Sequence, residues 1–253
     1  MKALIFAAGL GTRLRPLTDD RPKALVEVAG VPMLEHVIRH LADAGFRDIV
    51  VNVHHFGQMI IDFLAARDNF GLNIAVSDER DFLLDTGGGI LHARPLLDDG
   101  EPFLVHNADI LTTLDLRRFY DSHRNGGALA TLLVKHRDTQ RYFVFDRATN
   151  RLEGWLNKAT GETRPVALRY DAERQATLAF GGLHVISPEI FPLLQEHSRG
   201  ERKFSITPFY IEQCAAHVIN GYNPTGEDYA WLDVGKPDTL REAEVLFENL
   251  QRT

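Results

Sequence analysis

The sequence predicts an α/β fold in which helices cover both faces of a mixed, mostly parallel sheet. In the first half of the chain, short apolar runs alternate with segments whose apolar residues recur at helical spacing, as in strand–helix–strand units. In the second half, strand-like segments are joined by short polar connections typical of hairpins, so antiparallel strands are expected there. Together these observations predict a three-layer sandwich.

The first half alternates expected strands with expected helices. Residues 32–44 show the helical pattern, because Leu34, Val37 and Leu41 share one face, and Gly45 follows where a helix C-cap belongs. The expected strands are 2–7, 48–53, 72–76 and 102–106, and the expected helices are 32–44, 57–66 and 88–97. Ligands of parallel sheets bind at the carboxyl ends of the strands, so residues that directly follow these strands are candidates for a site.

The second half contains further strands and helices. The expected strands are 128–135, 142–146 and 177–186, and the expected helices are 188–196, 206–217 and 237–250. The polar segment 157–174 is expected to form a surface excursion. Because no linker, low-complexity tract or internal repeat is visible, the sequence predicts a single domain over residues 1–253, without the hexapeptide repeats of a C-terminal β-helix domain.

The composition is that of an ordinary globular protein, with 253 residues of which 44% are hydrophobic and 25% charged. The single cysteine, Cys214, excludes an internal disulfide framework and suits a reducing compartment. The apolar stretch 3–8 is too short for a signal peptide, and no run approaches the roughly 18 apolar residues of a membrane helix. We therefore expect a cytoplasmic protein with no membrane partner.

The net charge of −7 argues against a nucleic-acid partner, which usually requires a basic face. Locally the balance differs, since Arg13, Arg15, Arg21 and Lys23 fall within eleven residues. Such a cluster could attract an anionic ligand. The alternative is a solvated loop with scattered charges.

The most specific motif directly follows the first expected strand. Gly9 and Gly11 permit a tight turn whose amides form an anion-binding concavity, and Thr12 adds a hydroxyl. Arg13 adds a guanidinium that suits two phosphate oxygens at once. A dinucleotide-binding loop would need a third glycine where Leu14 stands, and a Walker A loop would need a G-K-[ST] sequence that is absent. The loop therefore predicts phosphate binding but not a dinucleotide-dependent oxidoreductase.

Three more charged residues suit phosphate chemistry. Lys23 follows Pro22, which stiffens the chain before the ammonium group; the alternative is an ordinary exposed lysine. Asp109 and Asp233 each follow an apolar run and are expected at strand ends, where two carboxylates suit a hard cation. The alternative for each aspartate is a helix N-cap.

The run Asp85-Thr86-Gly87-Gly88-Gly89 indicates a tight turn that opens a helix. A backbone without side chains lets a base or a sugar ring lie against it. The alternative is a helix N-terminus that is capped by Thr86 and uses glycines only for entry.

Several motifs, taken in order, resemble those of one enzyme family. They are Gly9-Leu10-Gly11-Thr12-Arg13-Leu14 with Pro16-Leu17-Thr18 and Pro22-Lys23, then Asp85-Thr86-Gly87-Gly88-Gly89, Asn107-Ala108-Asp109, Phe180-Gly181-Gly182-Leu183-His184 and Trp231-Leu232-Asp233-Val234-Gly235. They run over nearly the whole chain and resemble the signature of the sugar-1-phosphate nucleotidylyltransferases. The branch that looks closest contains N-acetylmuramate-1-phosphate uridylyltransferase and relatives similar to mannose-1-phosphate guanylyltransferase.

The resemblance implies a Rossmann-like sandwich and an enzyme that transfers a nucleoside monophosphate from a triphosphate to a sugar 1-phosphate. Residues 1–125 would bind the nucleotide and residues 126–253 the sugar phosphate. The implied residues are Arg13 on pyrophosphate and Lys23 on the reacting phosphates; Ala8, Gly9, Gly11, Thr12, Gly88 and Asn107 on the nucleotide; Gly182, Asn157 and Lys158 on the sugar phosphate; and Asp109 and Asp233 on Mg²⁺. Asp78 or Glu79 would touch the base edge.

The sequence departs from the family pattern at two places, and the first leaves open which residue contacts the sugar phosphate. The family commonly has Glu-Lys-Pro near the middle of the chain, with its lysine on the sugar phosphate. Here the sequence is Glu153-Gly154-Trp155-Leu156-Asn157-Lys158, so Lys158 is the substitute and Trp155 either stacks on a sugar or packs structurally. Ala108 stands where the family usually has glycine.

The resemblance favours UTP with N-acetylmuramate 1-phosphate or a similar amino-sugar phosphate, in cell-wall sugar metabolism. GTP with mannose or heptose 1-phosphate is the alternative within the family. A non-catalytic nucleotide-sugar sensor is the alternative from a different class. A monomer or small homo-oligomer is expected.

Overall fold

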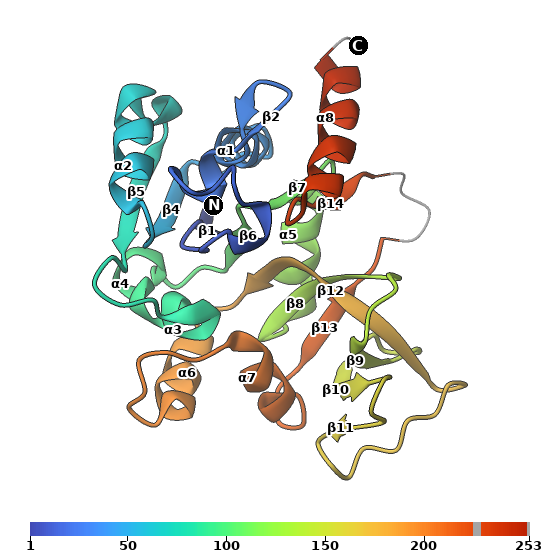
Figure 1. Cartoon of the computed structure of the whole chain (residues 1–253). Helices are drawn as coiled ribbons and strands as arrows, with labels where there is room; N and C mark the ends of the chain where they lie inside the picture. The colour runs from blue at the N-terminus through green and yellow to red at the C-terminus, as the bar shows by residue number, and fades with distance from the viewer. Residues whose placement is uncertain (225–228, 252–253) are drawn as a thin grey trace.

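The computed structural model describes residues 1–224 and 229–251 and is built around a ten-stranded sheet (Figure 1). The strands of this sheet are β1 (Lys2–Phe6), β4 (Asp48–Val53), β5 (Asn73–Asp78), β6 (Phe103–Asn107), β8 (Ala130–Lys135), β9 (Arg141–Asp146), β10 (Leu152–Asn157), β11 (Thr163–Arg164), β12 (Gln175–Ile186) and β13 (Ile219–Tyr222). Their order is β11-β10-β9-β12-β6-β1-β4-β5, with β8 between β12 and β13. Two short ladders join β2 (Glu27–Val28) to β3 (Val31–Pro32) and β7 (Ile110–Thr112) to β14 (Trp231–Asp233).

Helices cover both faces of the sheet. They are α1 (Met33–Asp43), α2 (Gly57–Ala66), α3 (Asp85–His92), α4 (Arg94–Leu97), α5 (Leu116–Gly126), α6 (Ile190–Ser198), α7 (Ile206–Gln213) and α8 (Pro237–Gln251), with the 3₁₀ turns η1 (Thr12–Leu14), η2 (Lys23–Leu25) and η3 (Asp68–Gly71). Side chains of a strand alternate between the two faces, so Ala3 and Ile5 of β1 pack with α1, α2, α5 and α8, whereas Leu4 packs with α3, α4, α6 and α7. The predicted three-layer sandwich is thereby confirmed.

The parallel strands end at one common edge. Phe6, at the end of β1, pairs with Asn52 of β4 on one side and with Asn107 of β6 on the other. β5 lies parallel to β4 in a register that places Asp78 beside Val53. The segments that follow β1, β4, β5 and β6 therefore emerge close together, although they are far apart in the sequence.

β12 joins this parallel region to the antiparallel part of the sheet (Figure 1). Its first residues pair with β9 and its last residues with β6, all antiparallel, while β8 runs along its other side. The register along β8 shifts between Phe180 and His184, where Gly182 has a φ of +77°. A bulge of this kind bends the strand next to the edge where the parallel strands end.

Several expected element boundaries need correction. The helix expected at 88–97 is two helices, α3 and α4, and the second has a proline in its first turn. The helix expected at 206–217 ends at Gln213. α5 was not foreseen, although Asp115 caps it by accepting a hydrogen bond from the Arg118 amide at 2.9 Å and Gly127 ends it at a φ of +60°.

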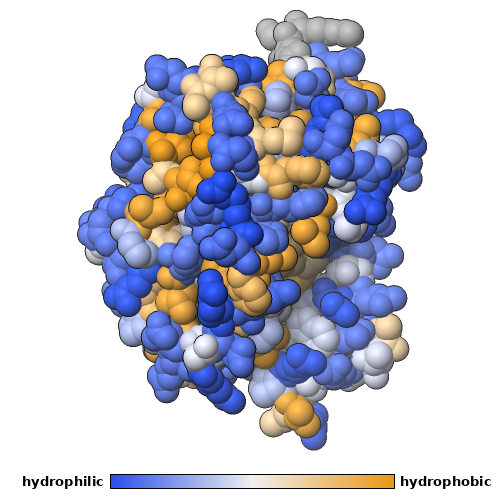
Figure 2. All heavy atoms as spheres, turned by 60° about the vertical axis from the view of Figure 1, so that its left-hand side comes forward, coloured by the Kyte–Doolittle hydropathy of each residue, from blue (hydrophilic) through white to orange (hydrophobic). Residues whose placement is uncertain are grey.

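Within residues 1–224 and 229–251, no helix combines the length and apolar character needed to cross a membrane. Figure 2 shows apolar residues interspersed among hydrophilic ones on one face of the molecule.

Candidate active site

The loop after β1 folds back onto η2. Gly11 has a φ of +65°, and a Cβ there would lie 3.0 Å from the Cβ of Lys23 and from Cγ2 of Thr18. The Thr18 hydroxyl donates to the Gly11 carbonyl at 2.9 Å, which fixes the turn. By contrast, a Cβ at Gly9 would meet no atom within 4 Å, so this glycine faces open space.

Asn52 shapes the start of this loop. Its Oδ1 accepts hydrogen bonds from the amides of Ala7 at 2.7 Å and Ala8 at 3.2 Å. The next three amides, of residues 9–11, donate to no acceptor in the described part of the chain. Successive unpaired amides in a glycine turn form a concavity that suits an anion.

Asn52 also links the loop to Glu79. The Asn52 amide donates to Oε1 of Glu79 at 2.8 Å, and the Leu84 amide donates to Oε2 at 3.2 Å. Glu79 is 3% exposed, and this burial raises the pKa of its carboxyl group, partly offset by the Asn52 hydrogen bond. Of the two base-edge candidates, Glu79 faces the site, whereas Asp78 forms a surface ion pair with Arg80 at 2.6 Å.

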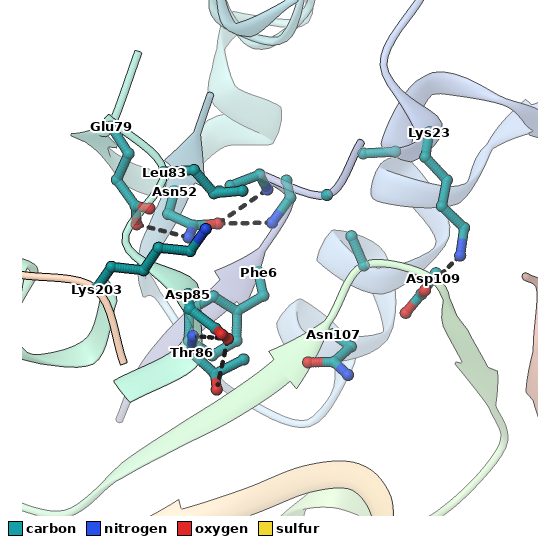
Figure 3. A pocket seen from close by; sticks show the side chains of 15 residues that line it. Phe6, Lys23, Asn52, Glu79, Leu83, Asp85, Thr86, Asn107, Asp109 and Lys203 are labelled. Carbon is teal, nitrogen blue, oxygen red and sulfur yellow. Dashed lines mark hydrogen bonds and ion pairs between the residues drawn. The ribbon is translucent and has the colours of Figure 1, made fainter. Parts of the chain in front are cut away.

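These segments surround a cavity of about 340 Å³, shown in Figure 3. It is lined by Phe6, Ala7, Ala8, Gly9, Lys23, Ala24, Asn52, Glu79, Leu83, Asp85, Thr86, Asn107, Ala108, Asp109 and Lys203. Figure 3 shows Lys23 and Asp109 at one end of this first cavity and Glu79, Leu83 and Lys203 at the other. Ala8, Gly9, Lys23, Asn107 and Asp109, all singled out from the sequence, therefore lie around one space.

Lys23 and Asp109 form an ion pair at one end of the first cavity (Figure 3). The Lys23 ammonium contacts Oδ2 of Asp109, and the whole lysine is only 9% exposed. Pro22, with a φ of −69°, directs the chain into the η2 turn that carries Lys23. The Asp109 carboxylate therefore already has a cation next to it, the Lys23 ammonium group.

Asp233 lies on the neighbouring strand. In the β7–β14 ladder Asp233 is opposite Ile110, and the Val234 amide donates to the Asp109 carbonyl at 2.8 Å. A Cβ at Gly235 would lie 2.9 Å from Oδ1 of Asp233 and 2.8 Å from Nη2 of Arg13. Arg13 and Asp233 therefore lie side by side, and the backbone of Asp233 neighbours that of Asp109, although Arg13 and Asp233 do not themselves line the first cavity.

The described residues contain no group of three or more His, Cys, Asp or Glu side chains that could hold a metal alone. Two aspartates at a rim beside free amides still suit a divalent cation such as Mg²⁺, which takes its remaining oxygens from phosphates and water. The residues present therefore fit such an ion.

The glycines at positions 87 and 88 let the start of α3 pack closely against the chain at residues 202–204. A Cβ at Gly88 would lie 2.2 Å from the Arg202 carbonyl oxygen, and the amides of Gly87 and Gly88 donate to the Phe204 carbonyl at 2.9 and 3.1 Å. Gly88 does not line the cavity; Asp85 and Thr86 do. The Thr86 hydroxyl accepts from the Ile206 amide at 3.0 Å, so it caps α7 rather than its own helix.

The three residues expected at the sugar phosphate lie in different places. Gly182 adjoins the first cavity, because a Cβ there would lie 3.0 Å from Nδ2 of Asn107. Asn157 lines a second cavity of about 580 Å³ between the antiparallel strands and α7. The exposed Lys158 lies with its Nζ 4.2 Å from the centre of the Tyr142 ring, outside both linings.

The sequence reading missed several lining residues. Asn52 places a polar side chain one residue before the end of the buried strand β4, and this pattern could have been recognised in the sequence. Lys203 and the arginines of the second cavity, Arg137, Arg141 and Arg164, lie in segments without a motif. Their positions depend on which loops the fold brings together.

The fold and the cavity define the class: an α/β protein with a cavity where its parallel strands end, the usual place for a nucleotide. A family model described as nucleotidyl transferase matches residues 2–249. N-acetylmuramate alpha-1-phosphate uridylyltransferase of Caulobacter vibrioides is 36% identical over 248 residues, covering 96% of this chain and 95% of that protein. Its namesake in Neisseria meningitidis serogroup B is 34% identical, covering 97% and 98%.

A mannose-1-phosphate guanyltransferase of Kluyveromyces lactis is 31% identical and covers 98% of this chain, which spans 65% of that protein. Among solved structures, HddC of Yersinia pseudotuberculosis in complex with GMP-PN has a TM-score of 0.75 at 21% identity, covering 97% of this chain and 99% of that one. A UDP-glucose pyrophosphorylase complexed with UDP-glucose has a TM-score of 0.76 at 18% identity, covering 98% of both. The chain belongs to the nucleotidyl transferase family and is a sugar-1-phosphate nucleotidylyltransferase, as its motifs predicted.

Proposed function

We propose that this enzyme transfers the uridylyl group of UTP to N-acetylmuramate 1-phosphate, or to a similar amino-sugar 1-phosphate, with Mg²⁺. The two uridylyltransferase relatives are similar along nearly their whole length, whereas the guanyltransferase relative extends well beyond this chain. The observation that supports the transfer reaction is the ion pair of Lys23 with Asp109 in the cavity, with Asp233 on the neighbouring strand and loop amides after β1 that donate to no acceptor in the described chain.

The proposed reaction is a direct displacement at the α-phosphorus of the triphosphate. An oxygen of the sugar 1-phosphate forms a bond to this phosphorus, and the bond to the bridging oxygen breaks, so pyrophosphate leaves with the electron pair. The attacking oxygen is already anionic at neutral pH, so no side-chain base is needed. Positioning and charge neutralisation then account for most of the catalysis.

Residues that line the first cavity, and others that follow β1 or lie on β14 beside it, divide these tasks. The amides of Gly9 and Gly11, with Thr12, hold the triphosphate, and Arg13 neutralises the departing pyrophosphate. Lys23 shares its charge between Asp109 and the reacting phosphates. A divalent cation held by Asp109 and Asp233 would supply further positive charge to the phosphate oxygens.

The remaining assignments follow from position. Ala8 and Asn107 line the nucleotide side, and Gly88 acts there only through the turn that its small size permits. Gly182 and Asn157 are assigned to the sugar side, because one adjoins Asn107 and the other lines the second cavity.

A substrate panel tests the proposal. Pyrophosphate release is measured with four nucleoside triphosphates, each against N-acetylmuramate, N-acetylglucosamine, mannose and heptose 1-phosphates, with and without Mg²⁺. We expect the highest kcat/KM for UTP with N-acetylmuramate 1-phosphate, and no release when Mg²⁺ is chelated. A preference for GTP with mannose or heptose 1-phosphate would replace the substrate assignment, and no release with any pair would favour a sensor.

A further inference from the structure

Two cations share one aromatic ring in the antiparallel half of the molecule. The Nζ atom of Lys135, at the end of β8, lies 4.4 Å from the centre of the Trp231 ring, and Cζ of Arg137 lies 5.2 Å from it. Within residues 1–224 and 229–251, no carboxylate oxygen lies within 4.0 Å of either cation. The ring faces attract the cations, but these two like charges have no carboxylate counter-ion among the residues that the structure describes.

Burial makes this missing counter-ion costly for Lys135. Its side chain is partly buried, and its pKa is lowered first by this burial and then by the charge of Arg137. An anion placed between the two groups would relieve both effects. Some other cations that lie over a ring are paired: Arg94, whose Cζ lies 5.4 Å from the Phe191 ring centre, has a partner in Asp98 at 3.0 Å. Lys158 on Tyr142 and Arg202 on Phe82 have no carboxylate partner among the described residues, but each lies alone over its ring.

The cation pair lies between the two cavities. The Trp231 indole nitrogen donates to the Gly181 carbonyl at 2.8 Å, and the adjoining Gly182 packs against Asn107 of the first cavity. Asp233 is two residues from Trp231 on β14, so both side chains point to the same side of that strand. Arg137 in turn lines the second cavity.

Backbone contacts hold Arg137 in place. The buried Tyr142 hydroxyl donates to the Arg137 carbonyl at 3.1 Å and accepts from the Thr139 amide at 2.9 Å. The turn after β8 is therefore tied to β9 before any ligand binds. The exposed Lys158 packs on the same Tyr142 ring, but it lines neither cavity.

We propose that Lys135 and Arg137, gathered at Trp231, bind the phosphate of the acceptor sugar 1-phosphate. This inference rests on the proposed use of a sugar 1-phosphate as acceptor. A phosphate monoester is dianionic near neutral pH and offers three oxygens to two cations. Bound there, it lies between Asp233 on the reactive side and the second cavity, which would receive the sugar. Lys158, the candidate from the sequence, is then not the main phosphate ligand.

Steady-state kinetics of Lys135→Met and Arg137→Met provide the first test. Loss of one charge-assisted hydrogen bond should raise KM for the sugar 1-phosphate about 10- to 100-fold, with KM for the triphosphate within about twofold of its starting value. Lys158→Met should change the acceptor KM less than about threefold. Arg94→Met is the matched control, because it removes a similar arginine–aromatic contact away from both cavities.

An unchanged acceptor KM in both Lys135→Met and Arg137→Met would overturn the inference, as would a larger effect of Lys158→Met. An equal rise in both substrate KM values would also count against it, because it would indicate a general distortion. Thermal unfolding of each variant identifies any that misfolds, and Lys135→Arg, which keeps the charge, should recover most of the acceptor affinity.

A binding experiment separates this inference from the proposed function. The chain has two tryptophans, so Trp155→Phe leaves Trp231 as the only one. We expect sugar 1-phosphate and, more weakly, inorganic phosphate to change Trp231 fluorescence without nucleotide or metal, and Lys135→Met to abolish the change. A response without turnover in the substrate panel would refute only the proposed function. Turnover with no response and an unchanged acceptor KM would refute only the anion site.

Discussion

The polar groups around the first cavity and the cations between the two cavities are stabilised in different ways. Around the first cavity, two side-chain pairs are already formed within the protein, Lys23 with Asp109 and Asn52 with Glu79, next to loop amides that donate to no acceptor in the described chain. Between the cavities, Lys135 and Arg137 are held on an aromatic ring without a carboxylate partner in the described chain. The first arrangement is preorganised and must exchange partners when substrate binds, whereas the second is incomplete until an anion arrives.

The largest expected effect comes from breaking the pair in the first cavity. Asp109→Asn should lower turnover about 10²–10³-fold, the scale of lost transition-state charge contacts, and should raise the Mg²⁺ requirement. It should also destabilise the protein by about 3 kcal/mol, because the buried Lys23 loses its partner. Turnover and denaturant unfolding measure the two effects.

The double variant Asp109→Asn/Lys23→Met separates them. It removes the uncompensated charge, so stability should largely return while turnover stays low. Asp99→Asn is the matched control, since it removes an exposed Lys2 ion pair of 2.9 Å and should cost less than about 1 kcal/mol. Normal turnover and normal metal dependence in Asp109→Asn would remove this residue from the site.

This contrast also explains what the sequence could and could not predict. The first cavity could be predicted from the sequence, because Gly9, Lys23 and Asp109 follow strands or turns in short motifs. Parallel strands end at one edge of a sheet, so these motifs were expected to lie together. Asp233 was foreseen by its apolar run and its resemblance to the family motif. Its meeting with Asp109 required the β7–β14 ladder, which joins strands over a hundred residues apart.

The proposed anion site could not be predicted from the sequence. Lys135 and Arg137 belong to no motif, and their ring comes from β14 at the other end of the chain. Gly88 shows the opposite case: its place near the nucleotide stays a prediction, and the structure adds a packing reason that the motif did not contain. The carbonyl that crowds it comes from Arg202, a contact that only the folded chain creates.

The second prediction concerns Arg13, whose exposed side chain should matter for catalysis alone. Arg13→Ala should lower turnover about 10²-fold with no change in unfolding midpoint, because little buried surface is lost. Arg15→Ala, two residues on and paired with Asp19 at 3.3 Å, is the matched control. Equal effects of the two variants on pyrophosphate release would show that the loop needs only its overall positive charge.

A smaller effect distinguishes Gly88, which packs against the Arg202 carbonyl, from Gly9, which lines the first cavity. Gly88→Ala should destabilise the fold by about 1–3 kcal/mol, since its Cβ would overlap the Arg202 carbonyl. Gly9→Ala meets no atom within 4 Å and should leave stability unchanged, while its methyl group raises KM for the triphosphate. Urea unfolding and kinetics on both variants measure the difference. The reverse outcome would mean that Gly88, not Gly9, faces the nucleotide.

The last expected effect is a pH dependence of stability from buried histidines. Burial lowers the pKa of His184 to about 3 and that of His123 to about 4. Both are neutral in the native protein, whereas the unfolded chain takes up protons below about pH 6.5. Stability should therefore fall as pH drops from about 6.5, approaching 1.4 kcal/mol per pH unit for each group.

His123 provides the sharper test, because its ring contacts both Thr131 of β8 and Ser187, which directly follows β12. Its Nδ1 lies 2.9 Å from the Thr131 hydroxyl and its Nε2 lies 3.0 Å from the Ser187 hydroxyl. His123→Gln can keep polar contacts but cannot titrate, so the slope of unfolding free energy between pH 6.5 and about 4 should decrease by up to about 1.4 kcal/mol per pH unit. An unchanged slope would show that His123 is already protonated in the native state.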